Sequence, residues 1–138
     1  MYRPFLVSVL LGVLSATALA SCDGVCACTP PPPELTGTWI GTYTSTLQPG
    51  TTYQATLQVT QTGIAVSGTL TTTAGRSANV SGSVNGPQLT ATFTFTEGCD
   101  GTATTTADIT SGDGQLDGSY SASDCLGQYT GGYALARQ

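Results

Sequence analysis

The sequence predicts an all-β domain, an eight-stranded antiparallel up-and-down barrel, and two observations lead to this prediction. Apolar residues alternate with threonine and serine in eight short segments from Leu35 onward, and a period of two is typical of strands that bury one face. Glycine, proline, asparagine or aspartate separates most of these segments, as hairpin turns require. The expected strands are residues 36–46, 52–61, 64–73, 77–85, 88–96, 102–110, 114–122 and 127–137.

A recurring apolar-x-Gly-x-apolar motif favours a closed barrel over a two-sheet β-sandwich. Examples are residues 66–70, 80–84 and 116–120. In each of them the period of two places the glycine on the apolar face, where a backbone without a Cβ atom lets the strand coil tightly inward. Closure also leaves no unpaired strand edge. The sandwich remains the alternative architecture.

The first 21 residues resemble a bacterial lipoprotein signal peptide. Arg3 precedes an apolar stretch, residues 5–14, that is too short to span a bilayer as a stable helix. The segment ends with LASC at residues 19–22, which resembles the bacterial lipobox, cleaved just before a cysteine that receives acyl chains. The resemblance implies that Cys22 is lipidated. A palmitate-like anchor would then hold the protein at the bacterial cell envelope, on the inner or outer membrane and on the periplasmic or surface side.

Cysteine arithmetic favours lipidation over ordinary secretion, for which residues 18–20 would supply an A-x-A cleavage site. Five cysteines are an odd number for an oxidising compartment, and lipidation of Cys22 leaves four. Cys26 and Cys28 lie in a tether, residues 22–34, whose four consecutive prolines favour an extended spacer. For this pair a local or intermolecular disulfide is favoured over a metal site, because the chain contains no histidine.

The charged residues of the mature chain exclude several function classes. Without the signal peptide, two arginines stand against eight acidic residues, a net charge of −6. Such a chain repels nucleic acids, because affinity for phosphates depends on lysine and arginine. With no histidine and no lysine, most acid–base and nucleophilic chemistry lacks its usual groups. We therefore expect no enzyme activity, no cofactor and no nucleic-acid partner; paired carboxylates for glycoside hydrolysis are the remaining enzymatic alternative.

The two ends of the β domain, residues 35–138, resemble the calycin pattern of lipocalins and, more loosely, avidins. The first strand opens with GTW at residues 37–39, and the last ends with LAR at residues 135–137. The resemblance implies that Trp39 lies at the closed end of the barrel and that Arg137 packs across its ring, a cation–π contact of about 0.5–2 kcal/mol. Unlike avidins, the chain has no second tryptophan, so no biotin site is expected.

Strand parity places the connections after the first, third, fifth and seventh strands at the end opposite Trp39, here called the mouth. Cys99 lies in the fifth connection and Cys125 in the seventh, on neighbouring hairpins. We expect a disulfide between them, which would close a loop of about 25 residues and stabilise the domain by roughly 3 kcal/mol.

Aromatic residues gather on the inward face near the mouth, and they are the candidate ligand-binding residues. One interpretation is a site for a small hydrophobic ligand, with the inward glycines leaving room below. The other is that the rings fill a narrow barrel, and the shortness of the strands favours this second interpretation. The candidates are Tyr43, Tyr53, Phe95, Tyr120 and Tyr129.

Acidic residues also gather at the other end, where Asp108 and Asp117 are expected to pair across a hairpin next to Asp113. A calcium ion would bridge them, but a solvated acidic turn is favoured. Taken together, we expect a membrane-anchored, non-enzymatic binding module for a small hydrophobic ligand or an envelope component. The alternative is a protein-interaction or inhibitor barrel that acts through its loops.

Overall fold

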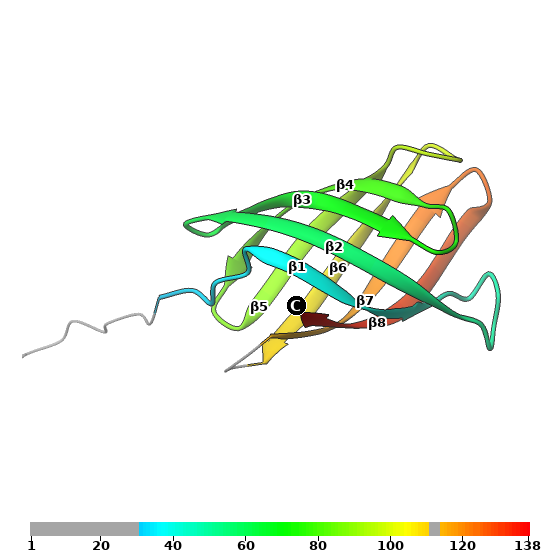
Figure 1. Cartoon of the computed structure of the whole chain (residues 1–138). Helices are drawn as coiled ribbons and strands as arrows, with labels where there is room; N and C mark the ends of the chain where they lie inside the picture. The colour runs from blue at the N-terminus through cyan, green and yellow to red at the C-terminus, as the bar shows by residue number, and fades with distance from the viewer. Residues whose placement is uncertain (1–30, 111–113) are drawn as a thin grey trace, which may run out of the picture.

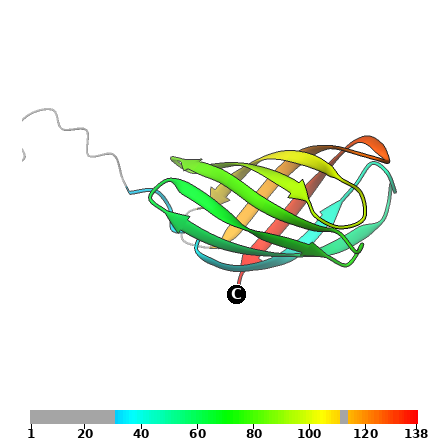
Figure 2. The same cartoon turned by 90° about the horizontal axis from the view of Figure 1, so that it is seen from above.

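The computed structural model describes residues 31–110 and 114–138, in which eight strands form one closed antiparallel barrel. Each strand pairs with the next one in sequence, and the last pairs back with the first (Figures 1 and 2). The strands are β1 (Gly37–Thr44), β2 (Thr52–Thr62), β3 (Ala65–Thr72), β4 (Ser77–Asn85), β5 (Gln88–Phe95), β6 (Gly101–Thr110), β7 (Gln115–Asp124) and β8 (Gly127–Arg137).

The predicted up-and-down barrel is therefore confirmed, and the two-sheet sandwich is excluded because β1 and β8 are paired from Trp39↔Arg137 to Tyr43↔Tyr133. No strand end differs from the expected one by more than two residues. The described ranges hold no helix with the length and hydropathy needed to cross a bilayer. Cys22, Cys26, Cys28 and Asp113 lie outside the described residues.

The two ends of the barrel differ in their connections. At the closed end, β2–β3 and β4–β5 are joined by tight turns at residues 63–64 and 86–87. The mouth carries a longer β1–β2 loop, residues 45–51, which projects beyond the strands in Figure 1. The described chain enters the barrel at the end opposite this loop (Figure 1).

The closed end is filled by large apolar side chains. Leu35, Trp39, Val84 and Leu116 are the largest fully buried residues, with Trp39 only 1% exposed. The Trp39 indole Nε1 donates a hydrogen bond to Leu35 O at 2.9 Å. Burial of these side chains fixes the start of β1 against its neighbours, because each apolar side chain removed from water contributes about 1.5–3 kcal/mol.

Two tyrosines lie over glycines on β7 and β8. In the cross-strand register Gly118 faces Tyr133 and Tyr120 faces Gly131. A Cβ atom added at Gly118 would lie 2.6 Å from Tyr133 Cζ, and one at Gly131 would lie 2.6 Å from the Tyr120 ring. Each glycine therefore makes room for a ring that lies flat across its strand, which offsets the cost of a mid-strand glycine.

Candidate functional site: an apolar cavity below the mouth

A cavity of about 560 Å³ occupies the interior between the mouth and the filled closed end. Its volume falls within the range of small-molecule sites, about 300–1,000 Å³. All five aromatic residues that the sequence nominated line this cavity. Its wall is otherwise mostly aliphatic, formed among others by Ala55, Leu57, Val59, Val66, Leu70, Val80, Leu89, Ala91, Phe93, Ala103 and Leu135.

Small inward residues explain why the interior is not filled. Ala55, Ala91 and Ala103 are all buried and line the cavity at mid-barrel, where larger side chains would meet in the centre. The interpretation that the aromatic rings fill the barrel was therefore wrong for this half of the interior. The rings stand at the wall of the cavity, whereas the largest fully buried side chains lie at the closed end.

Four tyrosines form a contiguous group along the wall at the mouth. The rings of Tyr43 and Tyr53 stack with their centroids 5.3 Å apart. Tyr120 meets Tyr43 edge-on at 6.4 Å and Tyr129 edge-on at 6.3 Å. Edge-on and offset pairs at these separations are favourable aromatic geometries, so the rings support one another in fixed positions.

Three of the four hydroxyl groups, those of Tyr53, Tyr120 and Tyr129, are hydrogen-bonded to the protein. Tyr120 Oη donates to Thr44 O at 2.8 Å, and Tyr53 Oη donates to Gln48 Oε1. Burial raises the pKa of the Tyr120 phenol. The phenol is therefore neutral at physiological pH and keeps its proton in the hydrogen bond to the backbone of β1.

A deeper tyrosine, Tyr133, was not nominated from the sequence. Its hydroxyl oxygen lies 2.7 Å from Thr105 Oγ1, and Thr105 Oγ1 donates to Ser119 O at 2.7 Å. Thr105 is the one buried polar residue of the described chain, 3% exposed. Burial raises the pKa of Tyr133. The alternation of inward and outward residues could have nominated Tyr133, because Tyr133 lies two residues after Gly131 and so on the same inward face.

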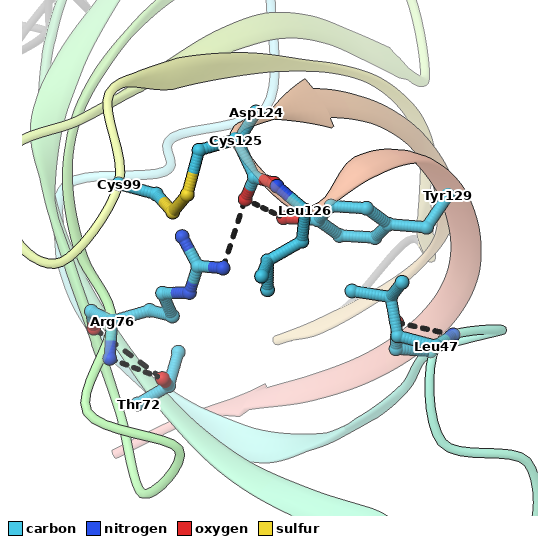
Figure 3. Close-up of polar contacts among 9 residues, drawn as sticks. Leu47, Thr72, Arg76, Cys99, Asp124, Cys125, Leu126 and Tyr129 are labelled. Carbon is cyan, nitrogen blue, oxygen red and sulfur yellow. Dashed lines mark hydrogen bonds and ion pairs between the residues drawn. A yellow bond between two sulfur atoms is a disulfide. The ribbon is translucent and has the colours of Figure 1, made fainter.

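An ion pair closes one side of the mouth (Figure 3). Arg76 Nη2 lies 2.8 Å from Asp124 Oδ2, which also accepts a hydrogen bond from Tyr129 Oη at 2.9 Å. The Leu126 N–H donates to Asp124 Oδ1 at 2.7 Å. Burial of Asp124 works to raise its pKa, but the hydrogen bonds from Leu126 and Tyr129 and the charge of Arg76 together hold that pKa below its usual value.

The same carboxylate affects its tyrosine partner. Burial, followed by the hydrogen bond to Asp124 and the charge of Asp124, strongly raises the pKa of Tyr129. The guanidinium of Arg76 also lies over the Phe95 ring, 5.3 Å from its centroid. A charge held between a carboxylate and an aromatic face is partly shielded from water. The ion pair joins the β3–β4 connection to the end of β7 across the mouth.

The β7–β8 turn leans over the cavity and is fastened by a disulfide. Cys99 and Cys125 are bonded, with their Cα atoms 5.6 Å apart. Leu126 follows in the turn and Leu47 lies in the β1–β2 loop, and the two side chains point toward the opening from different sides (Figure 3). Both line the cavity although 60% and 41% of their surface is exposed. Apolar side chains therefore rim an apolar cavity.

The other nominated residues lie away from the cavity. Arg137 Cζ lies 4.9 Å from the centroid of the Trp39 ring at the closed end. Asp108 pairs with Asp117 across the β6–β7 hairpin, and both are exposed. Leu47, Leu126 and Thr105 were not nominated. The two leucines lie in loops, where alternation does not show which way a side chain points, and Thr105 is a polar residue on the inward face of β6.

Comparison with protein-family models, with curated proteins and with solved structures finds no match.

Proposed function

We propose that the barrel is a non-enzymatic binding module that takes up a small hydrophobic molecule in its interior. The supporting observation is the cavity of about 560 Å³ with its aliphatic and aromatic wall. Apolar surface left inside a folded domain is stabilised when an apolar molecule displaces water from it. The exposed side chains of Leu47 and Leu126 at the rim give such a molecule an apolar path inward.

We also propose that the barrel is of the calycin type and that Cys22 carries a lipid anchor at the bacterial cell envelope. The Gly-x-Trp start of β1 and the Arg137 guanidinium over the Trp39 ring support the first part. The LASC sequence at residues 19–22 supports the second. The anchor makes the membrane a partner of the protein.

Fluorescence of N-phenyl-1-naphthylamine, which increases in apolar surroundings, tests the proposed binding. Residues 34–138 suffice for the experiment, because they contain every strand of the closed barrel and its whole buried core. We expect saturable binding by the oxidised domain. Absence of binding, together with native mass spectra that carry no retained molecule, would remove the proposal.

A matched pair of alanine variants locates the bound probe. Ala103 is buried and lines the cavity, whereas Ala134 on β8 is exposed. Ala103→Leu fills part of the cavity and is expected to weaken probe binding about tenfold or more, since steric exclusion costs at least about 1.4 kcal/mol. Ala134→Leu is expected to leave binding unchanged. Equal effects of the two variants would place the probe elsewhere.

The exposed leucines also favour a second candidate, an interaction or inhibitor barrel that acts through its loops. Leu47 and Leu126 lie near each other at one end, and exposed apolar side chains that lie together mark protein-interaction sites in many proteins. A Leu47→Ser/Leu126→Ser variant separates the two functions. If the cavity is the functional site, this variant is expected to slow probe uptake only modestly. If the loops are the functional site, it is expected to abolish the complex with the protein partner.

A further inference from the structure

Most of the tyrosine hydroxyl groups on the cavity wall already donate their protons to other groups of the protein. Four of the five tyrosines that line the cavity have hydroxyl groups hydrogen-bonded to other parts of the protein. Tyr120 donates to Thr44 O and Tyr129 donates to Asp124 Oδ2. A phenol that donates its single proton retains lone pairs that accept. A ligand in contact with these oxygens is therefore bound best if it brings the proton.

Tyr133 gives the clearest case, because its donor role follows from counting protons. Thr105 Oγ1 uses its one proton in the bond to Ser119 O, 2.7 Å away. The 2.7 Å contact between Thr105 and Tyr133 must therefore be donated by Tyr133. Thr105 is buried behind the ring and does not line the cavity, whereas Tyr133 does. The Tyr133 oxygen thus presents only acceptor capacity to a bound molecule.

The one cation at the mouth does not offer an anion site. Arg76 Nη2 is paired with Asp124 at 2.8 Å, and Arg76 Nη1 is buried with no hydrogen-bond partner among the described residues. A buried Nη1 has no surface for a ligand in the cavity to contact. Glu97 and Asp100 lie in the adjacent β5–β6 connection, so the mouth keeps a net negative charge. Tyr43, Ser45 and Gln48 keep hydrogen-bond donors of their own at the mouth. Deeper in the cavity, beside Tyr133, a carboxylate would lose its hydration without a free donor to replace it.

We propose that the cavity selects an uncharged apolar molecule carrying a hydroxyl group, such as a long-chain alcohol, over the corresponding carboxylate or ester. This inference rests on the proposed function and adds the chemical class of the ligand to it. The apolar part fills the aliphatic interior, and the hydroxyl group donates to a tyrosine oxygen, above all to that of Tyr133.

Displacement of N-phenyl-1-naphthylamine from the oxidised domain by three molecules of equal chain length tests the selection. We expect dodecan-1-ol to displace the probe at the lowest concentration, methyl dodecanoate at about 3- to 10-fold higher concentration, which is the value of about one hydrogen bond, and dodecanoate least well. Displacement by dodecanoate at or below the concentration needed for the alcohol overturns the inference while the proposed binding stands. If the probe itself does not bind, the proposed function fails first.

Two variants then assign the selection to Tyr133. Tyr133→Phe removes the acceptor and is expected to weaken the binding of dodecan-1-ol about 3- to 10-fold without weakening the binding of the ester. Thr105→Val keeps the Tyr133 oxygen but frees its proton for a ligand. In this variant the affinity for the ester is expected to rise relative to the affinity for the alcohol. Thr106→Val is the matched control, because Thr106 is the exposed neighbour on β6; it is expected to change neither ligand.

The outcomes of these variants are distinguishable from unfolding. Thermal unfolding measured in parallel must remain cooperative for all three variants. A Tyr133→Phe variant that folds and weakens alcohol and ester equally contradicts the assignment. A Thr105→Val variant that folds and leaves the alcohol-to-ester ratio at the wild-type value does so as well.

Discussion

Tyr120 lies across β8 at its cross-strand partner Gly131, and its hydroxyl group reaches Thr44 O on β1 at a distance of 2.8 Å. Tyr133 repeats the arrangement one strand away, lying over Gly118 and reaching Thr105 on β6. Each tyrosine thereby connects three strands instead of two. The barrel wall from β6 to β1 is held by these side-chain bridges in addition to the backbone ladder.

Gly131→Ala is expected to destabilise the barrel by about 1–3 kcal/mol, the usual cost of overpacking. The new Cβ would overlap the Thr44 carbonyl oxygen and displace the Tyr120 ring. Gly132→Ala is the matched control, because a Cβ there would be 3.6 Å from the nearest atom, Gly118 O. Urea unfolding of both variants measures the difference. Equal stability of the two variants would contradict the packing argument.

Reduction of the Cys99–Cys125 disulfide, or its replacement by two serines, is expected to lower the free energy of unfolding by about 2–4 kcal/mol. The bond closes a sequence separation of 26 residues, and without it the unfolded chain gains conformational freedom. Unfolding with and without a reducing agent measures the effect. The double-serine variant serves as the control, since it should no longer respond to the reducing agent.

Acid is expected to remove the contribution of Asp124 to stability. The folded protein holds the pKa of Asp124 below its usual value, so folding favours the ionised form. This contribution is fully present above the unfolded pKa of about 3.9 and is lost as the pH falls through the lower folded pKa. Urea unfolding should show that the wild type has a higher free energy of unfolding than Asp124→Asn at neutral pH, and that this difference narrows below about pH 4.

Glu34, whose pKa is lowered by hydrogen bonds with the Thr36 side chain and backbone, is present in both proteins of this comparison and cancels. A gap between wild type and Asp124→Asn that stays constant down to the lowest pH would mean that the ion pair with Arg76 adds nothing to stability.

Arg137→Gln is expected to destabilise the closed end by about 1 kcal/mol, the value of a partly exposed cation–π contact. The guanidinium also donates a hydrogen bond to Glu34 O. Since the chain has one tryptophan, its fluorescence reports this site directly. Arg137→Lys keeps the charge and should fall between the wild type and Arg137→Gln. Unchanged emission and unchanged stability in Arg137→Gln would rule out an energetic role for the contact.

Cys22→Ala tests the proposed lipid anchor. Cells that express the wild-type chain and receive labelled palmitate are expected to incorporate the label into the protein, and the variant is expected to incorporate none. The Cys99 and Cys125 double-serine variant should still be labelled, which excludes these two cysteines as the site of the label. Absence of label in the wild type would favour ordinary secretion.

Much of the fold was predictable from the sequence because the signal is local. A period of two in residues such as Leu89, Ala91 and Phe93 assigns an inward face without knowledge of the rest of the chain. Counting strands then places alternate connections at one end, and in this way Tyr43, Tyr120 and their partners were placed together. The same count brought Cys99 and Cys125 to neighbouring hairpins.

The cavity and its rim were not predictable by these means. Whether an eight-stranded barrel is filled depends on its tilt and stagger together with the summed volume of its inward residues, and alternation gives neither tilt nor stagger. Leu47 and Leu126 lie in loops, where the alternation ends. The ion pair of Arg76 with Asp124 joins the β3–β4 connection to the end of β7, so its geometry depends on how far that connection leans inward.

The fixed end of the barrel has a mechanical consequence. Leu35 is fully buried, the Trp39 indole holds its carbonyl group, and Arg137 binds the carbonyl group of Glu34. Tension on the segment that precedes the barrel therefore acts on the closed end, and the cavity below the mouth keeps its shape. With an acyl chain on Cys22, the domain would be attached through its closed end, and the mouth would be directed away from the bilayer. A bound ligand would then be exchanged with the aqueous space or with a surface opposite that membrane, and not with the anchoring bilayer itself.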